Sequence, residues 1–330
     1  MKDFCIVGSG IAGSTIANLL SKKYTIEVFD KARGVGGRAS SRRFKDEANF
    51  DHGTQYLNPK NNAFKKFLKI LKKKKVVKEW PGKHFDLCTI KKNHGIKLIG
   101  QKANNSISKY LLKKIKVNHL SKVIKIIFIN NIWEITTDNK KKKYFRNLIL
   151  TCPYPQLKPL AASYLPKDIL NLNVKMQPNI TVMAVFKDQE EIPVSSLRFN
   201  DSIIGWAANE NSKKRFKSKL SLWTLQSTIK WAYKFIDKYK KNKRGVANIV
   251  IERFLALTNY DKRKLIFVSI HGWKFSYNLN RTKFKSCWVK KYNLGVCGDW
   301  FLGPKVEHAW LSANNLFNQI KKNPPEIDGF

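Results

Sequence analysis

The sequence predicts an α/β protein in which a parallel-sheet domain is interleaved with a second, α+β domain. Three observations lead to this prediction. A strand, a glycine-rich turn, a helix and a second strand follow one another at the N-terminus, residues 156–289 combine period-two strands with helices, and a short apolar strand near the C-terminus ends in Gly298-Asp299. Strands that alternate with helices indicate a parallel sheet, whereas period-two patterns indicate strands with one buried face.

The first thirty residues have the order of a dinucleotide-binding βαβ unit. An apolar strand at 3–7 leads into Gly8-Ser9-Gly10-Ile11-Ala12-Gly13, a helix follows, and a second strand at 25–29 ends at Asp30. The glycines of such a unit permit a tight turn, close approach of the backbone to a pyrophosphate and close packing of helix on strand. The helix N-terminus presents free N–H groups to phosphate. We therefore predict a pyrophosphate at the turn and a ribose at Asp30.

The residues after the second strand indicate which nucleotide is bound. The segment Asp30-Lys31-Ala32-Arg33-Gly34-Val35-Gly36-Gly37-Arg38 resembles the flavin-specific extension of the glutathione-reductase-type FAD fold, in which a Gly-Gly-Arg segment passes over the pyrophosphate. Gly36 and Gly37 allow positive φ, and the guanidinium of Arg38 suits phosphate. A flexible basic loop is the alternative for this segment alone. After a complete nucleotide fingerprint, FAD is the better interpretation.

Composition sets the broad class of the protein. A length of 330 residues suits about two domains. A strand that starts at residue 3 leaves no room for a signal peptide, and no apolar run of about 18 residues indicates a membrane span. The five cysteines contain no C-x-x-C pair and indicate reduced thiols. The six histidines have no metal-ligand spacing, so we expect no bound metal. A cytoplasmic protein fits best.

The formal net charge of +41 raises the possibility of a nucleic-acid partner. Lysines are spread along the whole chain, and the runs 72–75 and 140–143 are expected at a helix end and in a turn, where solvent covers them. No nucleic-acid-binding motif accompanies them. We predict no dedicated nucleic-acid or membrane partner.

The remaining patterns predict how the two domains interleave. The FAD-binding domain is expected at 1–58, 105–155 and 290–325, and the substrate domain at 59–104 and 156–289. Helices are predicted at 61–78, 105–115, 229–240 and 245–258, and strands at 83–90, 95–99, 123–128, 133–136, 144–151, 180–186, 203–207, 220–224 and 265–270. The second G-x-G-x-x-G of a separate NAD(P)H-binding domain is absent from the sequence. Val123 is expected either near the adenine or in the core.

The C-terminal part resembles the closing segment of FAD oxidoreductases. A strand that ends in Gly298-Asp299 brings its aspartate to the ribityl or phosphate region there. The helix that begins near Val306-Glu307 directs its N-terminus at the flavin, where its dipole stabilises the anionic reduced ring.

These segments together resemble the renalase-like FAD-dependent oxidoreductases, which are related to the amine oxidases, over nearly the whole chain. The matching pieces are Gly37 to Arg43, Phe50 to Tyr56, Trp206 to Lys213, Trp223 to Ser227, Trp231, His271 to Phe275, Gly298 to Trp300 and Val306-Glu307. Three positions depart from the family, which usually has His where Gln226 stands, Arg where Gly272 stands and Gly where His308 stands.

The resemblance implies non-covalent FAD and a hydride transfer to flavin N5, with a dihydronicotinamide isomer as the small-molecule donor and O₂ as acceptor. A dihydropyridine is already a good hydride donor, so positioning matters more than acid–base chemistry. The candidate catalytic or pocket residues are Gln55, Tyr56, Trp206, Gln226, His271, Trp273 and Trp300. Core packing is the alternative for each tryptophan and for His271.

The predicted cofactor-binding residues are Gly8, Ser9, Gly10, Ile11, Ala12, Gly13, Asp30, Lys31, Gly37, Arg38, Gly53, Thr54, Gln55, Val123, Gly298, Asp299, Val306 and Glu307. Two other interpretations stay open. A flavin amine oxidase or a desaturase-like enzyme would share the FAD domain, and an amine oxidase would need a lysine near N5, for which Lys274 and Lys305 are candidates. A basic protein that binds flavin without turnover is the alternative from a different class.

Overall fold

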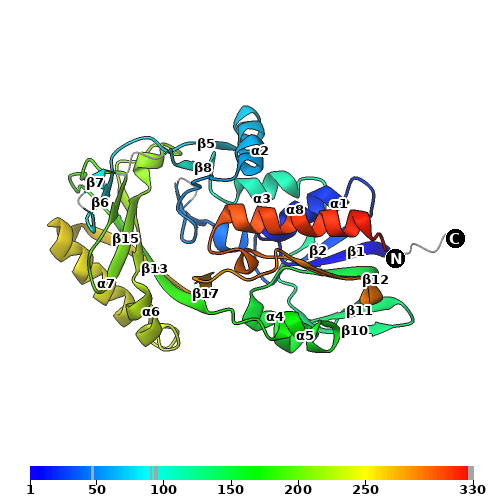
Figure 1. Ribbon diagram of the computed structural model, residues 1–330. Coiled ribbons are helices and arrows are strands. Elements are labelled where there is room, and N and C mark those ends of the chain that lie inside the picture. The colour runs from blue at the N-terminus through cyan, green and yellow to red at the C-terminus, as the bar shows by residue number, and fades with distance from the viewer. Residues whose placement is uncertain (46–47, 90, 93–95, 326–330) are drawn as a thin grey trace.

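The computed structural model describes residues 1–45, 48–89, 91–92 and 96–325, which form two bodies, each built on one large sheet. Figure 1 shows them side by side, with β13 (Met176–Phe186) and β17 (Leu265–Asn278) extending from one toward the other and the N-terminus at the far end of the first body. The fold class predicted from the sequence is confirmed: a mixed α/β body with a parallel sheet is interleaved along the chain with a body built on a mainly antiparallel sheet.

The first sheet has eight strands in the described part of the chain. They are β1 (Lys2–Val7), β2 (Ile26–Phe29), β9 (Lys116–Asn118), β10 (Val123–Ile129), β11 (Ile132–Thr137), β12 (Lys142–Leu150), β18 (Cys287–Val289) and β19 (Leu294–Val296). The order is β10-β11-β12-β1-β2-β9, and β19 pairs with the end of β12 and with β18. The pairs β12–β1, β1–β2, β2–β9 and β12–β19 are parallel. The predicted βαβ unit is therefore present.

Alternating side chains of β1 explain why both faces of this sheet are covered. Phe4 and Ile6 pack into one core with α1 (Ile11–Leu20), and Cys5 packs into the other. The first face also carries α2 (Asn62–Lys73), α3 (Ser106–Leu111) and α8 (Val306–Lys322), while α4 (Tyr154–Ala161) and α5 (Lys167–Leu170) cover the second face. Figure 1 shows α8 beside α1, so the first and last helices are neighbours.

The second sheet has seven strands in the described part of the chain, in the order β17-β13-β16-β15-β14-β6-β7. They are β6 (His84–Asp86), β7 (Lys91–Lys92), β13 (Met176–Phe186), β14 (Ser196–Arg198), β15 (Ile204–Asn209), β16 (Ser221–Ser227) and β17 (Leu265–Asn278). All pairs except β14–β6 are antiparallel. One face packs on α6 (Ile229–Phe235) and α7 (Lys243–Thr258), and the opposite face packs on the hairpin of β3 (Arg42–Phe44) and β4 (Ala48–Phe50).

The structure divides the stretch 59–104 differently from the predicted boundaries. Its helix α2 packs Phe64, Leu68 and Leu71 into the core of the first sheet, whereas β6 and β7 join the second sheet. The predicted helix 61–78 ends at Lys73, because the buried, β-branched Val77 begins β5 (Val77–Glu79), which pairs with β8 (Leu98–Gly100).

Several predicted boundaries shift in the structure. The helix predicted at 105–115 is shorter, and strand β9 follows it at 116–118. The helix predicted at 229–240 ends at Phe235, and the strand predicted at 265–270 continues to Asn278, which brings His271 into the sheet. Residues 90 and 95, at the ends of two predicted strands, lie outside the described residues. The helices α4 and α5 were not predicted.

Two further observations concern the class of the protein. Within the described ranges, none of the helices combines the length and the apolar character that a membrane crossing needs. All five cysteines are free thiols.

Candidate active site

A cavity of about 1660 Å³ lies between the two sheets. Its lining includes the β1–α1 turn, the segment 29–42, the loop 52–56, the strands β16 and β17 and the start of α8. The first turn of the chain and its last helix therefore open into the same space, as an extended nucleotide held at both ends requires.

Glycine backbone forms the floor of the nucleotide side of this cavity. Gly8, Gly36 and Gly37 have φ of +105°, +118° and +54°, a region that other residues rarely adopt. Gly10 and Gly36 form a β-bridge, which fastens the second glycine segment over the first. A Cβ on Gly13 would lie 1.9 Å from the carbonyl oxygen of Gly8. The close approach of helix to strand thus depends on the absence of a side chain there.

Asp30 holds the glycine turn against the end of β2. Its Oδ2 accepts hydrogen bonds from the backbone N–H of Ser9 (2.7 Å) and from the Ser9 hydroxyl (2.5 Å), and its Oδ1 accepts one from the N–H of Ala32 (2.8 Å). Asp30 also lines the cavity. The contact of Asp30 with a ribose stays a prediction, and the structure adds a second role for this carboxylate.

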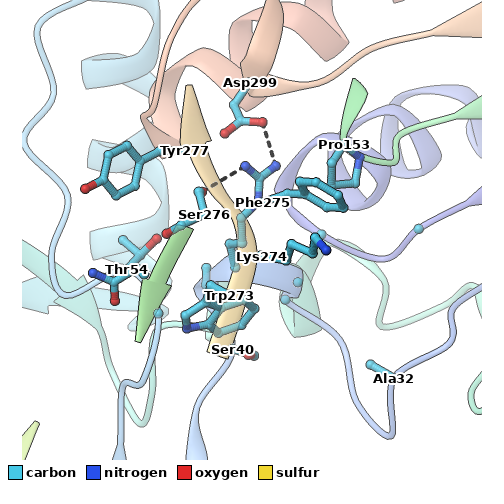
Figure 2. A pocket seen from close by; sticks show the side chains of 18 of the residues that line it. Ala32, Ser40, Thr54, Pro153, Trp273, Lys274, Phe275, Ser276, Tyr277 and Asp299 are labelled. Carbon is cyan, nitrogen blue, oxygen red and sulfur yellow. Dashed lines mark hydrogen bonds and ion pairs between the residues drawn. The ribbon is translucent and has the colours of Figure 1, made fainter. Parts of the chain in front are cut away.

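The two ends of the chain are joined by an ion pair at the cavity wall. The guanidinium of Arg38 lies 2.6 Å from Oδ1 of Asp299 and also donates to the carbonyl of Ser276 in β17 at 3.1 Å. Figure 2 shows these interactions as dashed lines that lead to Asp299 and Ser276. A charge-assisted bond of this length fixes the orientation of the arginine.

The residues present fit a bound FAD. The first turns of α1 (N-cap Gly10) and α8 (N-cap Lys305) donate no hydrogen bond to a capping side chain, and both line the cavity. Uncapped helix N-termini carry free N–H donors and partial positive charge, which suits a pyrophosphate. Asn105 lines the same wall, and its buried Oδ1 has no hydrogen-bond partner among the described residues. The helix N–H groups and Asn105 Oδ1 are therefore free to form hydrogen bonds with a bound nucleotide.

The loop 52–56 lies between the nucleotide side and the second sheet. A Cβ on Gly53 would lie 2.1 Å from the carbonyl oxygen of Arg38, and the N–H of Thr54 donates to the same oxygen at 2.8 Å. From the other side, the Gln226 amide donates to the carbonyl of Gly53 at 2.7 Å, and the Trp273 indole donates to the carbonyl of His52 at 2.9 Å. This loop is therefore bonded to both bodies.

Aromatic and imidazole rings form the wall opposite the glycine floor. The rings of Tyr56 and Trp206 lie 5.7 Å apart, and the ring of Trp273 stacks on His52 at 5.3 Å and contacts His271 at 4.2 Å. All five residues line the cavity. Stacked rings of this kind present flat apolar surfaces that suit a planar ligand.

The two histidines of this wall are neutral near pH 7. Burial, together with the neighbouring His271 and Arg42, lowers the pKa of His52 to about 3. Burial and Arg42 lower the pKa of His271 to about 4. Neutral imidazoles add no charge beside a ring ligand, and each retains one donor and one acceptor.

Most of the predicted cofactor-binding residues line the cavity. They are Gly8, Gly10, Ile11, Ala12, Asp30, Lys31, Gly37, Arg38, Gly53, Thr54, Gln55, Val123, Gly298, Asp299 and Val306. Ser9 and Gly13 lie behind the turn, where they shape it. Glu307 accepts hydrogen bonds from the backbone N–H groups of Lys60 and Asn61 and so fastens the start of α2.

Of the predicted catalytic residues, most line the cavity and one lies in the core. Gln55, Tyr56, Trp206, Gln226, His271 and Trp273 line the cavity. Trp300 is a correction: it is fully buried, stacks on Phe301 and donates to the carbonyl of Cys152, because the Gly-Asp turn directs it into the core of the first sheet. Trp300 therefore supports the wall from behind.

The three departures from the resembled family have different consequences. Gln226 lines the cavity and bonds the loop. At Gly272 a Cβ would lie 2.3 Å from the ring of Tyr239, so the tyrosine occupies the space of a side chain. His308 is buried against Gly303, outside the cavity lining. The substitution at 308 therefore changes helix packing rather than the cavity surface.

Sequence reasoning missed a buried cluster of charges beneath the loop 52–56. Asp51, Glu210, Lys213 and Arg215 have fully buried side chains. Lys213 Nζ lies 2.9 Å from Asp51 Oδ2 and 2.8 Å from Glu210 Oε2. Charged residues are rarely buried unless paired, and the sequence spacing of 162 residues between Lys213 and Asp51 hid the pair.

Comparison with known proteins first defines the class. Residues 6–71 match the family model of the NAD(P)-binding Rossmann-like domain. This match covers the glycine turn, the extension through Arg38 and most of α2.

More particular similarities agree with this class. The chain is 30% identical to renalase from Mus musculus over 192 residues, which is 52% of this chain, and it spans about half (52%) of the length of that relative. A candidate protoporphyrinogen oxidase from Exiguobacterium sp. 255-15 has a similar structure, with a TM-score of 0.75 at 11% identity, over 98% of this chain and 99% of that chain. A double mutant of putrescine oxidase, redesigned in its cofactor binding, also has a similar structure. Its TM-score is 0.67 at 11% sequence identity, over 97% of this chain and 99% of that chain.

These findings confirm the predicted fold class, and they confirm the predicted resemblance to renalase over about half of the chain. They also support the prediction of FAD as the cofactor.

Proposed function

We propose that this protein is an FAD-dependent oxidoreductase of the renalase-like type that oxidises isomeric dihydronicotinamide nucleotides. One observation supports this most strongly: a single cavity joins a glycine cradle that fits a dinucleotide to a wall of flat aromatic rings on the second sheet. FAD, when bound, supplies a hydride acceptor at N5 and a route for the electrons to O₂, which becomes hydrogen peroxide.

The residues of this chain would bind and align the two partners. The free N–H groups of α1 and the guanidinium of Arg38 would hold the diphosphate, and the N-terminus of α8 would face the flavin ring. Tyr56, Trp206 and Trp273 would cover the planar donor and keep water from it. Both histidines are neutral, and a dihydropyridine needs no proton removed before it gives a hydride. Alignment is therefore the main contribution expected of the protein.

A flavin amine oxidase is the second candidate, and a specific pair of residues favours it. Tyr56 and Trp206 line the cavity with their ring centroids 5.7 Å apart, and their ring faces suit an ammonium group placed over them. Of the two lysines suggested for such an enzyme, Lys274 pairs with Asp237 at 2.9 Å and has a largely exposed side chain. That pairing makes Lys274 a poor candidate for a lysine beside N5.

The test is anaerobic stopped-flow reduction of the FAD-loaded protein. Isomeric NADH and NADPH preparations are mixed in parallel with ordinary NADH, NADPH and a panel of mono- and diamines, and flavin absorbance is followed. Rapid bleaching by the isomers alone is expected, and admitted air should then restore the yellow colour with formation of peroxide. Bleaching by amines alone would replace the proposal with the second candidate.

Two other outcomes would reject both candidates. Reduction by polyenes would point to a desaturase-like enzyme. A protein that takes up FAD in a fluorescence titration but is reduced by none of these donors would be a flavin-binding protein without this activity.

A further inference from the structure

The buried charges beneath the cavity loop have no direct part in the proposed chemistry. We define the buried cluster as Asp51, Glu210, Lys213 and Arg215, and the cavity loop as residues 52–56. Every side chain of the cluster is shielded from solvent, and its four members are absent from the cavity lining. A group of this kind is costly to bury and is often no more stabilising than an apolar core. Its presence directly under the loop therefore requires an explanation other than stability.

Hydrogen bonds connect both carboxylates of the cluster to other segments of the chain. Asp51 Oδ1 accepts from the Ser41 hydroxyl at 2.6 Å and from the Asn104 backbone N–H at 3.0 Å. Glu210 Oε1 accepts from the Thr224 hydroxyl at 2.6 Å. Lys213 and Arg215 lower the pKa of Asp51 below its usual range although burial alone would raise it. Each carboxylate thus has a narrow choice of positions.

Lys213 connects this network to the cavity loop. Its Nζ lies 3.4 Å from Oε1 of Gln55, whose amide nitrogen donates to the carbonyl groups of Asp51 and Gly53. The Gln55 side chain is therefore bonded to the cluster, and Gln55 also lines the cavity. Gln55 acts as the anchor of the loop, and its neighbours Thr54 and Tyr56 form the cavity surface.

Asn104 provides a second connection between the cluster and the loop. Its amide nitrogen donates to the carbonyl groups of Thr54 (2.6 Å) and Gln55 (3.1 Å), and its Oδ1 accepts from Nη2 of Arg215 at 3.0 Å. The cluster consequently bonds the loop both at the Gln55 side chain and at its backbone carbonyls. A buried network of ion pairs and hydrogen bonds favours a single arrangement over the alternatives that an apolar contact would permit.

We propose that the buried cluster is a positioning device in which Lys213 holds the cavity loop in one conformation, so that Lys213 controls the alignment of bound ligands without touching them. Only the expected effect on the rate of flavin reduction rests on the proposed function. The conformation of the loop is a property of the chain and can be measured in protein without FAD.

The experiment compares three variants with the wild-type protein. Lys213→Met removes the ammonium group that contacts Gln55. Lys213→Met with Glu210→Gln removes one cation and one anion together, so that the cluster keeps its charge balance. We therefore expect the double variant to fold even if the single variant does not. Lys214→Met is the matched control, since this adjacent lysine is exposed. Hydrogen–deuterium exchange of the peptide 50–57 is measured without FAD, followed by FAD affinity and anaerobic flavin reduction.

We expect amide exchange in the peptide 50–57 to accelerate about tenfold or more in both Lys213 variants, with the control unchanged. The limiting rate of flavin reduction, expressed per bound FAD, should fall about tenfold or more, because misalignment lowers the rate of the bound complex more than the affinity for the donor. The double variant should regain thermal stability without regaining loop protection or rate. A role in stability alone would restore all three.

Two results would overturn the proposal. One is wild-type exchange of the loop peptide in the folded double variant, and the other is a wild-type limiting rate together with faster exchange. If the wild-type protein is reduced by none of the donors, the proposed function fails, while the exchange measurement still decides whether Lys213 positions the loop.

Discussion

The two sides of the cavity are built in different ways. The nucleotide side is made of backbone: the glycine turn, the segment ending at Gly37 and two uncapped helix N-termini. The donor side is made of side chains from β15, β16, β17 and the loop 52–56, which contact one another across the gap between the bodies. The first side depends on residues that are close in sequence. The second depends on contacts that only the assembled fold creates.

The largest effect is expected on the nucleotide side, from Gly13→Ala. The new Cβ would meet the carbonyl oxygen of Gly8 at 1.9 Å, and a backbone atom cannot move aside without shifting the turn. We expect a loss of about 3 kcal/mol or more in unfolding free energy and loss of FAD binding, measured by chemical denaturation and FAD titration. Gly34→Ala is the control, because its Cβ would have no described atom within 4 Å. Equal stability of the two variants would show that the turn tolerates a side chain.

A smaller effect is expected where the two ends of the chain meet. Arg38→Ala removes the partner of Asp299 and a cation suited to the diphosphate. FAD affinity should fall about 10- to 100-fold, because a charge-assisted bond is lost and a carboxylate is left facing the phosphates. Isothermal titration with FAD measures it. Arg33→Ala, in the exposed part of the same segment, should change affinity much less; an equal loss in both would indicate general electrostatic attraction only.

On the donor side, Gly272 and Tyr239 should behave as a pair. Gly272→Arg places a side chain where the tyrosine ring lies, so we expect about 1–3 kcal/mol of destabilisation from overpacking. The donor concentration that half-saturates the enzyme should also rise. FAD affinity should stay within about twofold of the wild-type value, because the clash is remote from the diphosphate. Adding Tyr239→Ala should recover most of the stability. Failure of the second change to help would show that the ring does not occupy this space in solution.

The smallest effect is a dependence of stability on pH that originates in the donor wall. Burial lowers the pKa of His52 to about 3 and that of His271 to about 4, below the ordinary value of about 6.5. The unfolded chain therefore binds protons first as the pH falls below about 6.5. Above that pH both histidines are neutral in the folded and the unfolded chain, and the protein has its full stability. Between about pH 6.5 and pH 4, each histidine lowers the free energy of unfolding by about 1 kcal/mol per pH unit.

Thermal unfolding of wild-type protein and of His52→Gln between pH 7.5 and 5 measures this dependence. The variant should show a shallower fall in melting temperature on acidification. Parallel curves for the two proteins would mean that His52 is not buried as a neutral ring.

The difference between the nucleotide side and the donor side explains which features could be predicted from the sequence. The βαβ unit, the glycine segment before Arg38 and the closing Gly298-Asp299 turn were recognised because each function lies in a few consecutive residues with required backbone geometry. The helix predicted at 61–78 ended early because Val77 gains more from pairing with β8 than from helix continuation. Trp300 was expected at the cavity because tryptophan suits both ligand and core, and only packing distinguishes the two.

By itself, the sequence determined the dinucleotide turn and the order of strands and helices that follows it, since glycine φ angles and local hydrophobic period act over a few residues. The tertiary structure alone decided that Gln55 turns toward Lys213, that Tyr239 fills the space at Gly272, and that Glu307 fastens α2. Each of those three outcomes depends on burial and on contact partners that are far away along the chain. The spacing of neighbouring residues predicts neither the burial nor the partners.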